Sequence, residues 1–446
     1  MARVTGKSNF RAAINWRPQT PFYYGWLVLA MTFLGTFAAS GVSQAVIGGI
    51  QDFIFEDMSW SRRTIALAAT SGTWAAGLVS PFIGRWADRF GPRWLMPVAL
   101  AIGGGAFFAL AGITAVWHFF AAYIVGRALS GQILMGVVSR TTTVNFFRRR
   151  RNIVLGLVSS FRPISVAINI MLMSALATRY SWRTAFNYLG VVSVLLILPV
   201  LVLMRRRPED IGLLPDGDQV SVSDSGSRAR AAGSLRAEFS WTVREAFGTR
   251  TLWFIILTSV LSTTASSTVG FSLKPYLVEV GISQTQAAAV LSLGTVLAIV
   301  NIGWGFLAER FTPRRCLFVA LVLTAGMNIF LTLVNTLPEA YAFAVLWGLS
   351  SRSIGSLEHM MLAQYYGRNS YGSILGTFGP FQTLGLGLGP ILGAVLRDVF
   401  GNYSTMYLLL VAVYLAAAAS IFLAQPPALP SRAGEEALPG RPAEKN

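Results

Sequence analysis

Long runs of apolar residues recur along almost the whole chain and are separated by short polar segments. A run of roughly 20 apolar residues is long enough to cross the hydrocarbon core of a bilayer as an α-helix. The sequence therefore predicts an all-α membrane protein with twelve transmembrane helices. Their approximate spans are 23–51, 64–83, 94–116, 119–141, 153–177, 184–204, 251–273, 286–308, 316–334, 340–362, 371–396 and 406–424.

The twelve spans divide six and six around a polar segment at residues 205–250. This segment contains the low-complexity run SVSDSGSRARAAGS, which is typical of a flexible linker. We expect a six-helix bundle on each side of it, at residues 23–204 and 251–424. The flanking residues, 1–22 and 425–446, are predicted to be tails, and the second of these to be disordered.

The two halves also repeat each other. GRWADRFGPRW at residues 84–94 follows the second span, and GFLAERFTPRR at residues 305–315 follows the eighth. Similarly, NFFRRRRNIVLG at 145–156 matches QYYGRNSYGSILG at 364–376. The bundles are therefore expected to be pseudo-symmetric. Parallel repeats of this kind place a substrate site near the membrane midplane, between the halves.

The distribution of charge along the chain predicts how the chain is oriented in the membrane. Only 12% of residues are charged, against about a quarter in a soluble protein, and the net charge is +17. Most of the 36 Lys and Arg lie in the tails and in the loops on one side of the predicted membrane. This asymmetry predicts that both termini are cytoplasmic in a multi-pass protein of the plasma (inner) membrane. It also argues against a nucleic-acid partner, despite the run of four arginines at residues 148–151.

The loop after the second span carries residues that resemble a signature of the major facilitator superfamily: Gly84, Asp88, Arg89, Gly91 and Arg93. The second copy of the loop departs from the signature, with Glu309 in place of aspartate, followed by Arg310, and Thr312 in place of glycine. Arg127 and Gly131 match a further pattern of that superfamily in its fourth span. The resemblance covers nearly the whole chain and implies a transporter of two six-helix bundles.

A narrower resemblance is to the branch that contains monocarboxylate porters and oxalate/formate antiporters. It rests on YYGWLVLA in the first span, KPYLVEVGISQTQAAAVLSLGT across the seventh and eighth, and YGSILGTFGPFQTLGLGLGP in the eleventh. Members of this branch often carry a carboxylate-binding arginine four residues before the glycine of the second loop signature. Here that position is Asn301.

The signature loop has a physical interpretation of its own. A carboxylate such as Asp88 can face the positive N-terminal end of another helix, while neighbouring arginines meet helix C-termini or acidic lipid headgroups. We therefore expect a conformational latch formed by Gly84, Asp88, Arg89, Gly91 and Arg93, with Glu309 and Arg310 in the second copy. The alternative is that these charges only determine topology.

The stretch SSRSIGSLEHM, residues 350–360, places three ionisable groups inside the tenth span. Such groups are costly in a bilayer and are functional candidates. Arg352 is at the centre of the span, and Ser356 and His359 share its helical face. Glu358 points about 120° away and is expected to face a neighbouring helix.

The repeat relates Arg140 in the fourth span to His359, so we expect the two to face each other across the cavity. Arg162 is near the midplane of the fifth span and is a candidate replacement for the arginine missing at Asn301. The predicted substrate-binding residues are Arg352, Arg162, Asn301, His359, Arg140 and Ser356. Glu358 and His359 are the candidates for proton coupling; the alternative for Glu358 is a structural ion pair with Arg352 or Arg140.

Arginines with little matching acid favour recognition of a carboxylate. The predicted function is therefore secondary transport of a small organic anion, such as a monocarboxylate, by alternating access in a monomer within the lipid bilayer. Three alternatives remain open: an exporter of drug-like or lipophilic compounds, an anion exchanger without proton coupling, and a non-transporting membrane sensor or scaffold. No enzyme activity, cofactor or metal site is expected from the motifs.

Overall fold

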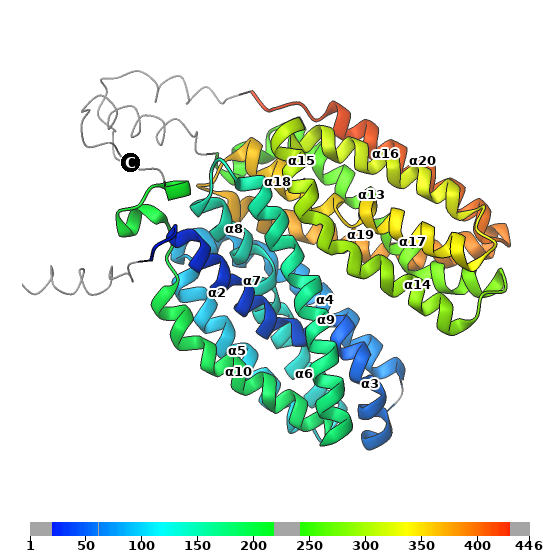
Figure 1. Cartoon of the computed structure of the whole chain (residues 1–446), viewed down its shortest axis with the longest axis horizontal. Helices are drawn as coiled ribbons and strands as arrows, with labels where there is room; N and C mark the ends of the chain where they lie inside the picture. Colours follow the sequence, from blue (N-terminus) through cyan, green and yellow to red (C-terminus); the bar gives the residue numbers. More distant parts are fainter. Residues whose placement is uncertain (1–19, 61, 218–240, 429–446) are drawn as a thin grey trace, which may run out of the picture.

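The computed structural model describes residues 20–60, 62–217 and 241–428, and those residues are almost entirely helical. Figure 1 shows two helical bundles, one drawn from blue to green and the other from green to red. The predicted all-α fold of two six-helix bundles is confirmed. The predicted basic lead and tails at residues 1–19 and 429–446, and the low-complexity run, lie outside the described residues.

The first bundle contains six membrane spans, some of them made of several consecutive helical segments. The segments are α2 (Tyr24–Ala39), η1 (Ser40–Val42), α3 (Gln44–Met58), α4 (Arg62–Phe90), α5 (Pro92–Ala111), α6 (Val116–Val125), η2 (Gly126–Gly131), α7 (Gln132–Met135), α8 (Val137–Phe146), α9 (Arg151–Arg179) and α10 (Trp182–Leu203).

The second bundle has the same organisation. Its segments are α13 (Arg250–Glu279), α14 (Gln284–Val296), η5 (Leu297–Val300), α15 (Asn301–Phe311), α16 (Pro313–Leu331), α17 (Leu337–Ser351), α18 (Ile354–Tyr366), α19 (Tyr371–Phe400) and α20 (Tyr403–Leu423).

Within the described residues, nine helical stretches are long and apolar enough to cross a membrane by length and composition alone. The remaining three predicted spans correspond to α4, to α14–α15 and to α17–α18. These three contain charged or polar groups, such as Asp88, Asn301 and Glu358, where the bundles meet or where the bundle interior is polar. Membrane helices tolerate such groups when protein, rather than lipid, surrounds them.

Two spans are interrupted near their middle. The fourth span changes from α7 to α8 at Gly136, whose backbone is non-helical (φ −111°, ψ −112°). The tenth span changes from α17 to α18 at Arg352 and Ser353. Irregular backbone at membrane depth is tolerated where it lines a cavity inside the protein.

The linker differs from the expected free coil where it is described. Residues 205–217 form the short helices η3 (Pro208–Ile211) and η4 (Pro215–Gly217), and α12 (Val243–Phe247) precedes α13. Trp241 and Ala246 are buried. The ends of the linker therefore pack on the bundles. We call this end of the molecule the linker side and the opposite end the far side.

The bundles touch at the linker side and spread apart towards the far side (Figure 1). Two helix pairs make most of this contact: α4 with α19, and α9 with α15. Glycines allow the close approach, because a Cβ atom at Gly84 would collide with the backbone of Gly372, and one at Gly156 would collide with the backbone of Asn301. We call these contacts the α4–α19 seam and the α9–α15 seam.

Candidate functional site

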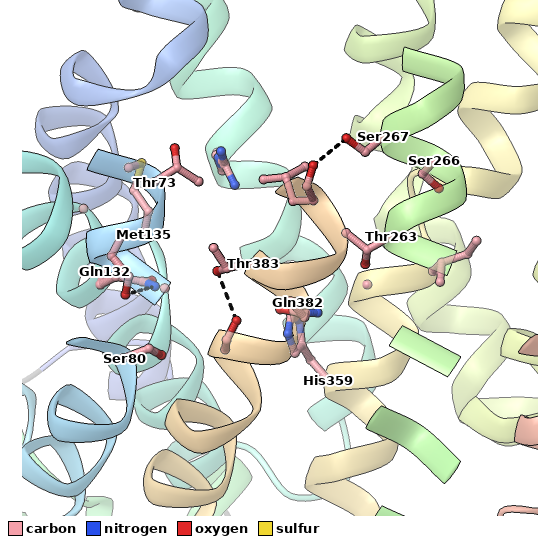
Figure 2. A pocket seen from close by; sticks show the side chains of 18 of the residues that line it. Thr73, Ser80, Gln132, Met135, Thr263, Ser266, Ser267, His359, Gln382 and Thr383 are labelled. Carbon is pink, nitrogen blue, oxygen red and sulfur yellow. Dashed lines mark hydrogen bonds between the residues drawn. The ribbon is translucent and has the colours of Figure 1, made fainter. Parts of the chain in front are cut away.

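A cavity of about 690 Å³ lies between the two bundles. Its walls come from both halves of the chain, chiefly α4, η2–α8 and α9 on one side and α13, α18 and α19 on the other. Figure 2 shows polar side chains converging on it from both bundles: Thr73, Ser80, Gln132, Thr263, Ser266, Ser267, His359, Gln382 and Thr383. Such a polar interior between membrane helices is a candidate substrate site.

All four arginines predicted inside spans line this one cavity: Arg127, Arg140, Arg162 and Arg352. The described lining residues also include His359, and they include no Asp or Glu. Arg162 is within electrostatic range of the other three guanidinium groups. The cavity therefore has a strongly positive interior.

The arginines differ in their protein contacts. The guanidinium of Arg352 lies 4.9 Å from the centre of the Trp347 ring, a cation–π contact. Arg140 donates from Nη1 to the carbonyl of Gly136 over 3.3 Å. Arg162 makes no hydrogen bond or ion pair to any residue that the structure describes, and its side chain is exposed in the cavity. Its five donors are thus available to a ligand.

His359 reaches the cavity from α18, and Arg140 reaches it from α8. The two side chains interact electrostatically, and Gln382 from α19 contacts the His359 ring (Figure 2). Tyr371 donates its hydroxyl to the His359 carbonyl over 3.2 Å. His359 is therefore held at the wall of the cavity by two residues of α19.

Glu358 is buried behind the cavity wall and does not line the cavity. Its carboxylate accepts hydrogen bonds from Ser259 (2.8 Å) and Ser262 (3.4 Å) of α13 and from Gln382 (3.2 Å) of α19. It thus faces neighbouring helices, and it forms no ion pair with Arg352 or Arg140 in the described structure. Ser262 and Gln382 both line the cavity, so they separate Glu358 from it.

Two other predicted substrate-binding residues do not line the cavity. Ser356 donates to Ser159 of α9 over 3.0 Å, which joins the two bundles. Asn301 is buried in the α9–α15 seam, where its carbonyl lies against Gly156. Arg162 lies further along α9 than Gly156, so it occupies a different level of the molecule from Asn301.

In the α4–α19 seam, Asp88 caps the first turn of α19. Its two carboxylate oxygens accept from the backbone N–H of Gly372 (3.1 Å) and of Ser373 (2.6 Å). Asp88 is in the last turn of α4, rather than just past the helix as its loop position suggested.

The α9–α15 seam repeats this arrangement. Glu309, near the end of α15, accepts from the backbone N–H of Asn152 over 2.9 Å in the first turn of α9. Ile153 contributes a second backbone hydrogen bond. The repeat seen in the sequence is therefore reproduced as two equivalent contacts between bundles.

The other residues of the signature loops surround these carboxylates. Gly91 has a φ of +72°, which glycine adopts readily, and Thr312 has the equivalent φ of +77°. The guanidinium groups of three arginines lie near the ring of the next residue, in the pairs Arg89–Phe90, Arg93–Trp94 and Arg310–Phe311. Arg89 and Arg310 are exposed, as expected for side chains at a membrane surface.

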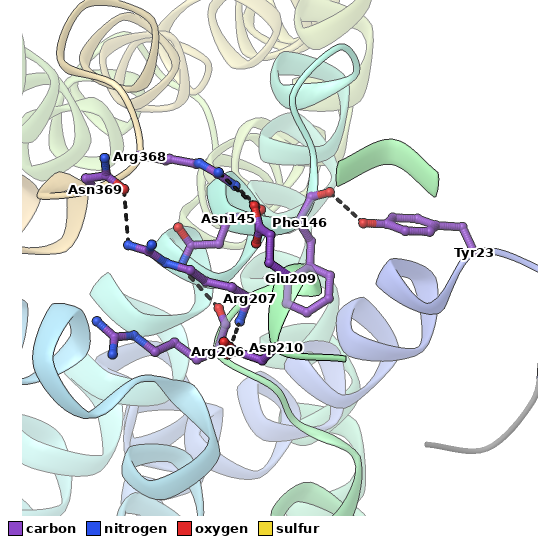
Figure 3. A network of polar contacts seen from close by, with 9 residues as sticks. All are labelled: Tyr23, Asn145, Phe146, Arg206, Arg207, Glu209, Asp210, Arg368 and Asn369. Carbon is purple, nitrogen blue, oxygen red and sulfur yellow. Dashed lines mark hydrogen bonds and ion pairs between the residues drawn. The ribbon is translucent and has the colours of Figure 1, made fainter. Parts of the chain in front are cut away.

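The linker adds a polar contact between the bundles that the sequence did not suggest (Figure 3). Arg207 donates to Asn369 over 3.1 Å, and Glu209 forms a 2.7 Å ion pair with Arg368. Arg368 also donates to the Asn145 carbonyl over 3.4 Å. We call Arg207, Glu209, Arg368 and Asn369 the linker clasp.

Gln382 and Ser259 are the polar residues most clearly missed in the sequence. Gln382 is the single amide side chain of α19, in a glycine-rich and largely apolar span, and this was an available signal. Ser259 is one of many hydroxyl residues of α13, which usually bond their own backbone. Nothing local distinguished it from its neighbours.

Comparison with known proteins identifies relatives over most of the chain. A family model described as Major Facilitator Superfamily matches residues 32–303 and 255–445. Monocarboxylate transporter 12 of Homo sapiens is 24% identical over an aligned length of 287, and the alignment covers 59% of this chain and 54% of that protein. Monocarboxylate transporter 3 of Rattus norvegicus is 26% identical over an aligned length of 445, and the alignment covers 94% of this chain and 83% of that protein.

The chain thus matches only about half the length of the human relative. Among solved structures, the transporter FucP in the outward conformation aligns with a TM-score of 0.68 at 13% identity, over 90% of this chain and all of that one. The proton:xylose symporter XylE aligns with a TM-score of 0.64 at 14% identity, over 90% of this chain and 95% of that one. The fold and the family model agree, and the chain belongs to the major facilitator superfamily.

Proposed function

We propose that this protein is a secondary active transporter of a small organic anion. The observation that carries the proposal is the cavity between the bundles, which four arginines line without a described acidic residue. Guanidinium groups suit planar recognition of a carboxylate through two parallel hydrogen bonds. The names of the monocarboxylate transporter relatives support a carboxylate as the anionic group.

Arg162 and Arg352 are the proposed anchors for this group. They belong to different bundles, and each exposes part of its side chain in the cavity. An anion that contacts both would be held by both halves and would neutralise groups that otherwise repel each other. Arg140 and His359 reach the cavity from different bundles, interact electrostatically, and are proposed to complete the site.

Transport is proposed to occur by alternating access. The two seams and the linker clasp close the linker side, while the bundles spread on the far side. We assign the linker side to the cytoplasm, because basic side chains such as Arg148 to Arg151 and Arg205 to Arg207 gather there. This closed-inside arrangement corresponds to the outward conformation named for the similar FucP structure. A monomer in the plasma (inner) membrane is sufficient for this cycle.

Asp88 and Glu309 are proposed to act as the conformational latch. Each places a carboxylate on the N-terminal turn of a helix in the other bundle, where the helix dipole favours a negative charge. Separation of the bundles on the linker side would break these contacts. The latch would therefore stabilise one state of the cycle without touching the substrate.

Proton coupling is proposed to involve Glu358. Its carboxylate is buried, is bonded by Ser259, Ser262 and Gln382, and is separated from the cavity by two of them. Gln382 also contacts His359, so a change in the protonation of Glu358 can affect, through Gln382, a side chain that lines the cavity. In the test below, uptake by Glu358→Gln that still responds fully to a proton gradient would exclude this role.

The proposed function is tested with purified protein in liposomes, offered labelled carboxylates with and without a pH gradient. We expect carboxylate uptake, a loss of binding in Arg162→Gln and Arg352→Gln, and normal uptake in a matched surface variant, Arg397→Gln. Uptake of a neutral or cationic lipophilic compound, with no carboxylate transported, would instead favour an exporter of drug-like compounds. Binding of the anion without transport would favour a sensor.

A further inference from the structure

The charge of the cavity exceeds what one carboxylate can balance. Arg127, Arg140, Arg162 and Arg352 remain protonated in proteins, and none of the described residues that line the cavity is acidic. A monocarboxylate contributes a single negative charge. Charges taken out of bulk water are costly unless they are paired, so a ligand with more negative charge suits this site better.

The four arginines also reach the cavity from four different segments of the chain. Each of three arginines has a different tyrosine as its electrostatic neighbour: Tyr123 for Arg127, Tyr371 for Arg140 and Tyr414 for Arg352. Arg162 is within range of all three arginines. An anionic group in the cavity can therefore be approached by guanidinium groups from several different places in the fold.

These places belong to both bundles. Arg127, Arg140 and Arg162 are on η2, α8 and α9 of the first bundle, and Arg352 is at the α17–α18 break of the second. A small, single anionic group can pair closely with only one or two guanidinium groups. A molecule with two anionic ends can pair with one bundle at each end.

We propose that the substrate carries two separated negative groups, as an aliphatic dicarboxylate does, with one group bound by the arginines of the first bundle and the other by Arg352. This inference rests on the proposed transport of an organic anion. The cavity of about 690 Å³ has room for such a molecule. Binding across the bundles links substrate binding to their relative position.

The test compares butanoate with butanedioate, which differ by one carboxylate at equal chain length. Binding to the full-length purified protein is measured at pH 7.5, where both carboxylates are ionised, at constant ionic strength. Because its second carboxylate can form a second charge-assisted pair, we expect butanedioate to bind about ten- to a hundredfold more tightly than butanoate. Butyl phosphate is included as an anion whose charge is compact.

Variants then locate the second group. Arg352→Gln is expected to remove most of the preference, so that butanedioate and butanoate bind with similar affinity. The matched control is Arg397→Gln, because Arg397 pairs with Glu279 at the surface, 3.2 Å away, and does not line the cavity. This control should keep the full preference. Folding is checked for each variant by its thermal midpoint.

Three results would overturn the inference. Butanoate could bind as tightly as butanedioate; butyl phosphate could bind more tightly than the dicarboxylate; or Arg352→Gln, correctly folded, could keep the full preference. Each would leave the proposed transport of an organic anion intact. The proposed function itself would be wrong if the protein bound none of these anions but did bind a neutral or cationic compound.

Discussion

The two seams that close the linker side are built on the same plan with different residues. Asp88 caps α19 in one, and Glu309 caps α9 in the other. The α4–α19 seam is reinforced, since Arg206 of the linker donates to the Asp88 carbonyl and the linker clasp lies directly before α19. Duplication thus preserved a carboxylate on a helix N-terminus and a glycine contact in both seams, while the described linker contacts reinforce the α4–α19 seam.

The largest effect is expected where a side chain is added between the two backbones. Gly84→Val would place a side chain against the carbonyl of Gly372, which cannot rotate away, and Gly305→Val would do the same at Asn152. We expect each change to destabilise the closed arrangement of the linker side by about 1–3 kcal/mol. The distance between the two bundles at the linker side should increase. Spin labels at exposed Phe90 and Phe311, with Cys316 replaced by Ala, would measure that distance.

The matched control for this pair is Gly303→Val, because Gly303 is exposed on α15 and a Cβ there meets only Val300, 3.9 Å away. An unchanged distance distribution in Gly84→Val would show that the close helix contact is not what holds the bundles together.

The second effect compares the two caps. Asp88→Asn keeps one carbonyl acceptor but loses the charge and the second acceptor, so we expect about a tenfold shift away from the closed linker side. Glu309→Gln should act in the same direction by about threefold, because its side chain is exposed and lacks the support of Arg206. The same spin-label pair measures both populations. Equal effects, or a larger one for Glu309, would contradict the proposed inequality.

A smaller effect is expected in the linker clasp. Glu209→Gln removes the ion pair with Arg368, but the Glu209 side chain is about a third exposed. Partly exposed ion pairs contribute less than about 1 kcal/mol, so the closed population should fall by about twofold. The change should weaken as salt is added, because ions screen the interaction. A salt-independent effect would point to a steric role instead.

The smallest effect concerns the backbone. Thr312 is a β-branched residue at a φ of +77°, where Gly91 stands in the first copy. Thr312→Gly should raise the thermal midpoint, because the free energy of unfolding should increase by about 0.5–1 kcal/mol. The backbone strain that glycine relieves at this φ should exceed the conformational entropy that glycine adds to the unfolded chain. Gly91→Ala should lower it. A lower midpoint in Thr312→Gly would mean that side-chain contacts of Thr312 outweigh the strain.

The sequence predicted the fold well because its signals were local and repeated. Apolar length defined the spans, and the offset between the two signature loops indicated two bundles. The four arginines within spans could be identified as candidates because lipid makes each one costly. That they line one cavity depended on the packing of helices far apart in the chain, which periodicity does not determine.

Other parts of the site needed the structure. Asn301 was selected by comparison of positions within a family, yet it lies in a seam where the helices touch. The partners of Glu358 come from α13 and α19, and neither has a spacing relation to α18 in the sequence. The linker clasp depends on a fold-back of residues 207–209 onto the other bundle, which polar composition alone does not predict.

The arginine cavity is proposed to bind an organic anion. The most direct measurement is the binding of a labelled carboxylate to the purified protein, compared with Arg162→Gln, Arg352→Gln and the control Arg397→Gln. We predict saturable binding in the wild type and the control, weakened at least about tenfold in each cavity variant. Equal affinity in all four proteins, or no carboxylate binding to a folded wild type that binds a neutral compound, would contradict the account.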